Sequence, residues 1–186
     1  MKVGVVSDTH MMKKFIDETI PYLKECDLIV HAGDNFSDSK YIHSMTKVSV
    51  MAVKGNCDVE NVEDELVFEV EGKTIFLCHG DKYGVNVKYG IDMLQSKAKS
   101  MNVDIVIFGH THTPICIEKD GILYLNPGSV SLPREVKYRS FVILDIENEK
   151  IKINEVKLLK DVRICECKLS TKPFKCLPHK VSFASS

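Results

Sequence analysis

The chain has 186 residues, 44% of them hydrophobic, so we expect one domain with a sizeable core. The formal net charge of −1 excludes the basic surplus of a duplex-binding protein and makes nucleic acid a poor candidate partner. No apolar run approaches the ~18 residues of a membrane span, and residues 2–6 resemble a strand rather than a signal peptide, so we predict a cytoplasmic protein without a membrane partner.

Strands and helices alternate in the first third of the sequence. Short apolar runs predict strands at 3–6, 28–32 and 48–53. The intervening segments predict helices, and such alternation requires crossover connections between parallel strands. In parallel sheets of this kind, ligands bind beyond the carboxyl ends of the strands.

Two helices are expected between these strands. An amphipathic pattern predicts the first over residues 12–23, where Pro21 would kink or shorten it. Ser37 or Asp38 would cap the second, which would end at Met45.

Beyond residue 60 the pattern is richer in strands. Residues 67–70 and 73–78 predict a hairpin, and residues 87–99 predict a helix. Further strands are expected at 103–108, 115–118, 122–125, 141–146 and 151–159. A parallel half followed by a strand-rich half indicates an α/β fold in which two sheets pack face to face with helices outside.

We find no repeat or linker, so residues 1–159 are expected to form one domain and residues 160–186 an irregular extension. The extension contains Cys165-x-Cys167 and Cys176-x-x-His179, four donors of the type that bind zinc, although their spacing matches no standard finger. The alternative is a tail without metal that lies over the domain or is disordered. The odd count of seven cysteines argues against a disulfide framework, and the first four, Cys26, Cys57, Cys78 and Cys116, are expected to be free, buried thiols.

Seven side chains with oxygen or nitrogen donors follow directly after five of the predicted strands. They are Asp8, His10, Asp34, Asn56, His79, His110 and His112. Asp8-x-His10 and His110-x-His112 would each present two donors to one place if their backbone is extended, because residues i and i+2 then point the same way. Asp34 is the candidate to bridge two divalent ions. Singly, Asp-x-His can be a surface coincidence and Gly-Asp a turn; the joint order is the specific signal.

Five motifs in this order resemble those of the calcineurin-like metallophosphoesterases: Asp8-x-His10, Gly33-Asp34, Gly55-Asn56-Cys57-Asp58, His79-Gly80 and Gly109-His110-Thr111-His112. Gly-Asn-Cys-Asp and the later Asn126-Pro127-Gly128-Ser129 are similar to the small YfcE-type phosphodiesterase branch. The resemblance spans about residues 1 to 158. It implies a four-layer α/β/β/α sandwich of two mixed sheets with helices outside and a di-metal site at the strand ends.

The resemblance also implies roles for individual residues. It places Asp8, His10 and His112 on one metal, Asn56, His79 and His110 on the other, and Asp34 as the bridge between them. The implied reaction is hydrolysis of small phosphodiesters by a hydroxide that bridges the two metals, with Asn56, His110 and Asp34 as catalytic residues. Asn56 and Cys57 would lie next to the substrate. A homo-oligomer, a dimer or a tetramer, is typical of this branch.

One position departs from the wider superfamily. Many members have Gly-Asn-His where this chain has Cys57, and that imidazole is implied to protonate the leaving group. A thiol is a poorer acid–base catalyst near neutral pH. We therefore expect a preference for diesters with stabilised leaving groups, such as aryl esters, unless Cys57 is only a packed thiol.

Five further residues lie outside this set of donors. His31, inside a predicted strand, is expected to be a core histidine or a hydrogen-bonding partner of a ligand, whereas His43 has no assigned role. Residues 126–129 predict a turn, and the resemblance implies that Gly128 or Ser129 touches the site. Arg134 would bind phosphate or form a surface salt bridge.

The ligand types and the resemblance leave the metal and the function class partly open. Imidazole, carboxylate and amide donors suit Mn²⁺, Fe²⁺, Ni²⁺, Co²⁺ or Zn²⁺ rather than Ca²⁺, and the resemblance favours manganese. The alternatives to a phosphodiesterase are a phosphomonoesterase, a nuclease of the same superfamily, and a non-catalytic scaffold of retromer-subunit type. The intact ligand set argues against the scaffold, and the lack of extra DNA-binding segments argues against the nuclease.

Overall fold

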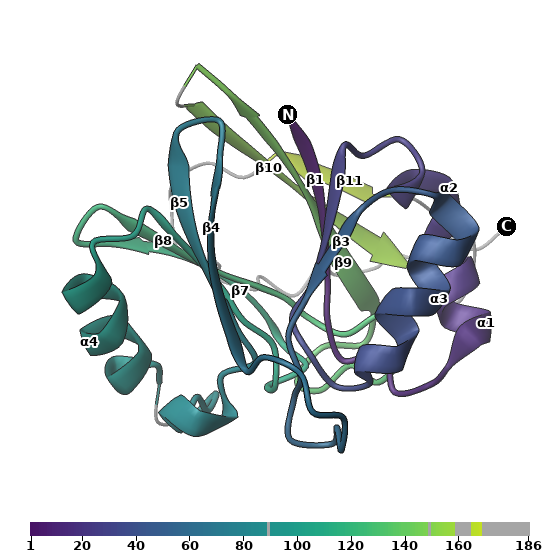
Figure 1. Cartoon of the computed structure of the whole chain (residues 1–186), viewed down its shortest axis with the longest axis horizontal. Helices are drawn as coiled ribbons and strands as arrows, with labels where there is room; N and C mark the ends of the chain where they lie inside the picture. The colour runs from purple at the N-terminus through teal and green to yellow at the C-terminus, as the bar shows by residue number, and fades with distance from the viewer. Residues whose placement is uncertain (89, 149, 159–164, 169–186) are drawn as a thin grey trace, which may run out of the picture.

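The computed structural model describes residues 1–88, 90–148, 150–158 and 165–168. Within them the chain forms two mixed sheets (Figure 1). The first has the order β11-β10-β9-β1-β2-β3, with bounds β1 (Lys2–Val6), β2 (Leu28–His31), β3 (Val50–Ala52), β9 (Arg139–Glu147), β10 (Lys150–Leu158) and β11 (Cys165–Lys168). The second has the order β4-β5-β6-β8-β7, with bounds β4 (Glu65–Val70), β5 (Lys73–Cys78), β6 (Ile105–Ile107), β7 (Pro114–Lys119) and β8 (Ile122–Pro127).

Each sheet is built around three parallel strands. In the first sheet, β1, β2 and β3 are parallel, and β9 is antiparallel to β1 with Val5 opposite Val142. In the second, β5, β6 and β8 are parallel, while β4 and β7 are antiparallel edge strands. The parallel strands confirm the crossover topology expected from the alternating pattern.

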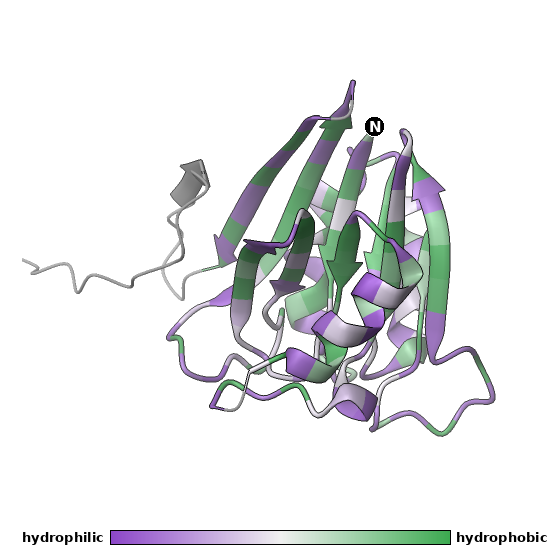
Figure 2. Ribbon diagram, turned by 90° about the vertical axis from the view of Figure 1, so that its left-hand side faces the viewer, coloured by the Kyte–Doolittle hydropathy of each residue, from purple (hydrophilic) through white to green (hydrophobic). Residues whose placement is uncertain are grey.

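Helices cover the outer faces of both sheets, as Figure 1 shows. On one side lie α1 (Lys13–Asp17), α2 (Ile20–Leu23) and α3 (Phe36–Thr46), and on the other lies α4 (Asp92–Met101). The predicted four-layer α/β/β/α sandwich is therefore confirmed. In Figure 2 the hydrophobic residues are concentrated in the strands, and the loops at the strand ends are largely hydrophilic.

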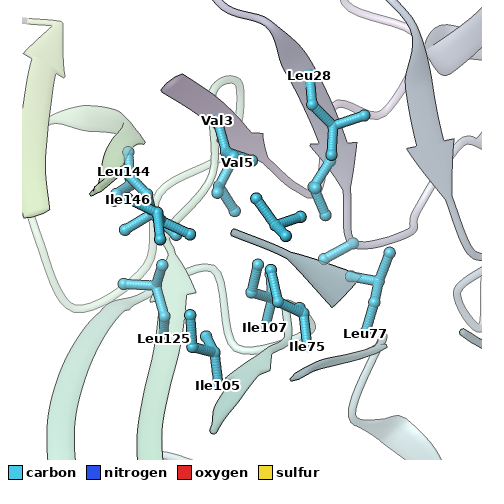
Figure 3. Close-up of a cluster of buried hydrophobic side chains, with 14 of the residues drawn as sticks. Val3, Val5, Leu28, Ile75, Leu77, Ile105, Ile107, Leu125, Leu144 and Ile146 are labelled. Carbon is cyan, nitrogen blue, oxygen red and sulfur yellow. The ribbon is translucent and has the colours of Figure 1, made fainter. Parts of the chain in front are cut away.

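Three apolar clusters hold the four layers together. The central one lies between the sheets and includes Val5 of β1, Leu77 of β5 and Leu144 of β9 (Figure 3). Two outer clusters pack α4 against the second sheet and α1–α3 against the first. Burial of apolar surface on both faces explains why the parallel strands are continuous apolar runs.

Several element boundaries differ from the prediction. The helix expected over 12–23 is two short helices, because Pro21 cannot donate in a helix interior and instead occupies the first turn of α2. Neither Ser37 nor Asp38 caps α3, which starts at Phe36; Asp38 instead accepts a hydrogen bond from the Met11 amide at 2.8 Å. The helix expected over 87–99 starts only at Asp92.

The tail is described only in part. Residues Cys165–Lys168 form β11, which pairs antiparallel with β10, so the expected lack of regular structure is wrong for these four residues. Cys176 and His179, which complete the possible zinc set, lie outside the described residues. Among the described residues, none of the helices is long and apolar enough to cross a membrane.

Candidate metal centre

The seven predicted donors lie on loops that follow β1, β2, β3, β5 and β6, and most of these loops turn sharply. Five of the donors have a left-handed backbone: Asp8 (φ 53°), His10 (φ 48°), Asp34 (φ 58°), His110 (φ 68°) and His112 (φ 55°). The premise that the two Asp/His-x-His pairs are extended is therefore wrong. Non-glycine residues rarely adopt this conformation, and their concentration here indicates a site whose backbone is held by its surroundings.

Four of the donors form one compact group. Asp8, His10, Asp34 and His112 each offer one atom, and these atoms all lie within 4.8 Å of one another. The Nε2 atom of His112 is 3.3 Å from Asp8 Oδ1 and 3.2 Å from the Nε2 atom of His10. The Nε2 atom of His10 is in turn 3.6 Å from Asp34 Oδ2. This arrangement could hold one metal ion.

The other three donors lie on the opposite side of Asp34. The Nε2 atom of His79 is 3.4 Å from Asp34 Oδ1, and Nδ1 of His110 is 2.9 Å from Asn56 Oδ1. The rings of His79 and His110 meet edge to face with centroids 5.2 Å apart. Asp34 therefore directs one carboxylate oxygen toward each group, as a bridging ligand would.

Backbone carbonyls orient two of the imidazoles. Nδ1 of His79 lies 2.7 Å from the Ala32 carbonyl, and Nδ1 of His112 lies 2.6 Å from the Leu132 carbonyl. Because a carbonyl only accepts, each Nδ1 carries the proton and each Nε2 presents its lone pair to the centre. This is the tautomer required of a metal ligand.

Two glycines allow the loops to approach each other. A Cβ atom on Gly55 would lie 2.2 Å from Asp34 Oδ1, and one on Gly109 would lie 2.0 Å from the Ser7 hydroxyl. Any larger residue would displace the carboxylates of the site. The glycines of Gly-Asn and Gly-His are therefore required by the close packing of the four loops that follow β1, β2, β3 and β6.

The buried side of the centre contains polar atoms without a hydrogen-bond partner. Among the described residues, both carboxylate oxygens of Asp8 and the Nε2 atom of His79 are buried and make no hydrogen bond. Burial raises the pKa of Asp8 to about 7 and lowers the pKa of His112 to about 4. Since buried polar groups normally have partners, these atoms fit a cation that the donors would surround.

Asp34 behaves differently from Asp8. Burial on its own would raise the pKa of Asp34, but His79 and the Cys57 amide, which donates to Oδ1 at 3.0 Å, together hold it below its ordinary value. Asp34 is therefore ionised near neutral pH, as a bridging ligand must be.

Comparison with known proteins identifies the family. The model of the calcineurin-like phosphoesterase superfamily domain matches residues 1–149. The chain belongs to this superfamily. A probable metallophosphoesterase of Methanocaldococcus jannaschii is 35% identical to this chain over 156 residues, which cover 80% of the chain and 78% of the relative. Phosphodiesterase YfcE of Escherichia coli strain K12 is 30% identical over 123 residues, which cover 60% of the chain and 62% of YfcE.

Solved structures share the fold of this chain. An archaeal phosphodiesterase aligns with a TM-score of 0.70 and 25% identity over 85% of this chain and all of that one. A single mutant of Vps29 from Entamoeba histolytica aligns with a TM-score of 0.75 and 24% identity over 91% of this chain and all of that one. The predicted resemblance to the superfamily and its YfcE-type members is confirmed.

His31 of the phosphoesterase is buried and connects two of the ligand loops. Its Nδ1 accepts the Gly33 amide at 3.2 Å, so the proton lies on Nε2, which is 3.0 Å from the Thr9 hydroxyl. Thr9 in turn donates to the Asp34 carbonyl at 3.2 Å. Burial lowers the pKa of His31 to about 4, so the imidazole in this series of hydrogen bonds is neutral near pH 7. Both predicted roles apply, since His31 is a core residue that also supports ligands.

Replacing Thr9 with valine is expected to weaken this connection. The variant leaves the buried His31 N–H without an acceptor, which should cost about 1–3 kcal/mol of unfolding free energy and lower Mn²⁺ affinity about tenfold. Thr19→Val is the matched control, because its buried hydroxyl also donates to a carbonyl, that of Ile16 at 2.7 Å, but far from the site. Calorimetric titration with Mn²⁺ measures the affinity of both variants. Equal Mn²⁺ affinities of Thr9→Val and Thr19→Val would show that Thr9 does not position ligands.

Sequence reasoning missed part of the support beneath Asp8. The hydroxyls of Ser129 and Ser131 donate to the Asp8 carbonyl at 2.7 and 2.8 Å, and Asn126 donates to the Gly109 carbonyl at 2.6 Å. Ser129 does touch the site, because its side-chain hydroxyl contacts the backbone of Asp8. Gly128 instead faces Ser140. The Asn-Pro-Gly-Ser segment signals a turn in the sequence, but the sequence does not show which loop the turn supports.

The remaining candidates separate clearly. Cys57 is exposed, so the packed-thiol alternative is wrong. The expected burial of the first four cysteines holds for Cys26 and Cys78, whereas Cys116 is half-buried; all four are free. His43 lies near the end of α3 and its Nδ1 donates to the Val48 carbonyl, away from the centre.

Proposed function

We propose that this phosphoesterase is a two-metal phosphodiesterase that hydrolyses small phosphodiesters. The observation that carries the proposal is the position of Asp34, whose two oxygens face two separate groups of nitrogen and oxygen donors. One carboxylate shared by two such groups is the usual way to hold divalent ions about 3.5–4 Å apart for in-line displacement at phosphorus.

The proposed ligands divide between two ions. Asp8, His10 and His112 would hold the first with Asp34, and Asn56, His79 and His110 would hold the second with Asp34. When bound, divalent ions lower the pKa of water and neutralise charge on phosphoryl oxygens. The donors are nitrogen and oxygen atoms, and we propose Mn²⁺, with Fe²⁺, Co²⁺, Ni²⁺ or Zn²⁺ as alternatives.

The exposed side of the centre is the proposed substrate side. Asn56 and Cys57 are exposed and His110 is half-buried, whereas Asp8, His79 and His112 are buried. A phosphodiester would approach over Asn56 and His110, which would orient the phosphoryl oxygens. The names of two similar proteins, YfcE and the archaeal phosphodiesterase, support diesters over monoesters.

Hydrolysis of bis-p-nitrophenyl phosphate and of p-nitrophenyl phosphate tests the proposal. The protein is stripped with a chelator and then reloaded with Mn²⁺, Ni²⁺, Zn²⁺ or Mg²⁺. We expect no activity after chelation, recovery with Mn²⁺, and a higher kcat/KM for the diester. Preference for the monoester would make the chain a phosphomonoesterase instead.

Replacing Cys57 with histidine is expected to broaden the leaving groups. Burial, followed by the neighbouring Asp34, raises the pKa of the Cys57 thiol to about 11, so it is a poor proton donor to a departing alkoxide. Histidine should raise kcat/KM on 2′,3′-cyclic AMP about tenfold or more and change bis-p-nitrophenyl phosphate hydrolysis little. Cys57→Ser is the control without an imidazole, and an equal effect of both variants would contradict the idea.

A binding scaffold is the second candidate, because several structures of Vps29 share the fold, including Vps29 of Entamoeba histolytica in complex with Zn²⁺ at a TM-score of 0.73. A protein that binds two metal ions but hydrolyses no phosphoester would favour this alternative. Affinity purification with the metal-loaded protein would then be the next experiment.

A further inference from the structure

A cavity of about 330 Å³ opens directly beside the proposed second metal position. Its lining includes the proposed ligand His110 with its neighbour Thr111, residues 85–88, and Arg134 with Glu135. Its volume is within the range of small-molecule sites. A substrate bound at the metal centre would therefore extend its remaining groups into this cavity.

Arg134 is held at the rim by its backbone. Its amide donates to the His112 carbonyl at 3.2 Å, and its carbonyl accepts the Thr113 hydroxyl at 3.5 Å. The side chain is exposed and forms no ion pair with any described residue. The predicted surface salt bridge of Arg134 is therefore absent among the described residues.

The charges around the cavity favour more than one negative group on the substrate. Asp8 and Asp34 are the only two anions among the seven proposed ligands, so two divalent ions leave excess positive charge. Arg134 adds a positive charge to the cavity lining and has no ion pair among the described residues. A diester that carries a second anionic group can contact both regions at once.

We propose that the cavity binds a second phosphate of the substrate through Arg134, so that the preferred substrates are phosphodiesters bearing an additional phosphate monoester. The planar guanidinium suits bidentate contact with phosphate oxygens. The inference rests on the proposed phosphodiesterase function and names its substrate class. In this proposal Arg134 contacts only the second phosphate and not the scissile diester. It therefore determines which diesters are preferred and takes no part in the bond cleavage itself.

Two matched substrates test this inference: thymidine 5′-(p-nitrophenyl phosphate) with and without a 3′-phosphate. Both release the same leaving group, so the ratio of their kcat/KM values isolates the second phosphate. With Mn²⁺ at low ionic strength, the 3′-phosphate should raise kcat/KM about tenfold. Arg134→Gln should reduce this ratio to about one, and Arg134→Glu should bring it below one.

Lys137→Gln is the matched control, because it removes one exposed positive charge from the same loop but outside the cavity. It should keep the tenfold ratio. A ratio near one in the unaltered protein overturns the inference. An equal loss on both substrates in Arg134→Gln also overturns it, because Arg134 would then act on the scissile phosphate itself.

A binding measurement separates this inference from the proposed function. Calorimetry on the Mn²⁺-loaded protein compares thymidine 3′,5′-bisphosphate with thymidine 5′-monophosphate. If neither diester is hydrolysed but the bisphosphate binds about tenfold more tightly, and only when Arg134 is present, the cavity is confirmed and the phosphodiesterase function fails. If the diesters are hydrolysed without any preference, the function stands and the cavity inference fails.

Discussion

Asp34→Asn is expected to lower kcat for diester hydrolysis about a thousandfold and to reduce bound Mn²⁺ from about two ions per chain to about one. Asparagine keeps one oxygen but replaces the other with an amide N–H₂ group, so only one of the two donor groups retains an oxygen from this residue. The remaining oxygen can still accept the Cys57 amide, so the fold should be retained. Kinetics on bis-p-nitrophenyl phosphate and metal analysis by mass spectrometry measure the two effects.

The matched control for this prediction is Asp120→Asn. Asp120 lies in the exposed turn between β7 and β8, where it pairs with Lys99 at 2.7 Å, and the substitution makes the same chemical change far from the centre. It should alter neither activity nor metal content. Two bound ions and nearly normal activity in Asp34→Asn would exclude Asp34 as the bridge.

Asp8→Asn is expected to stabilise the protein at pH 7 in a chelator and to lose that advantage over the unaltered protein in excess Mn²⁺. Burial raises the pKa of Asp8 from 3.8 to about 7. The folded protein therefore binds a proton that the unfolded chain releases between pH 4 and 7, so stability from Asp8 is present below about pH 4 and lost as pH rises to 7. The unfolding free energy lost in this way amounts to about 4 kcal/mol, and asparagine avoids the loss because it does not ionise.

Urea unfolding of both proteins across this pH range measures the effect. The low pKa of His31 destabilises both proteins as pH falls below 6.5, so its contribution cancels in the difference between them. That difference should grow from pH 4 to 7 and then remain constant. Mn²⁺ at a thousandfold excess over Kd adds about 4 kcal/mol to the protein that binds it. A difference that does not change with pH would contradict the assignment.

The layers of the fold could be predicted from the sequence, but the order of the strands could not. Buried parallel strands leave apolar runs that are visible locally, as at residues 28–32. The pairing of β1 with β9 joins residues such as Val3 and Leu144, and no local pattern records a contact of that separation. The late start of α4 has a local cause, since Asn86 pairs with Gly90 in a bridge that excludes a helix there.

The candidate site was predicted better than its support. The seven donors could be found because each follows a strand and because their order matches a known family. Their left-handed backbone was not predicted, since it depends on contacts such as those of Ser129 and Ser131 with Asp8. The role of Thr9 also depends on a side chain, His31, that is adjacent only in the folded protein.

The distribution of the donors along the chain has a consequence for synthesis. Asp8 and His112 are more than a hundred positions apart, and the carbonyls and hydroxyls that orient them extend to Leu132. A nascent chain that ends before this point would contain at most an incomplete first centre. Metal acquisition should therefore follow translation and docking of the two sheets, so that metal supply in the compartment, rather than the ribosome-bound chain, decides which ion is incorporated.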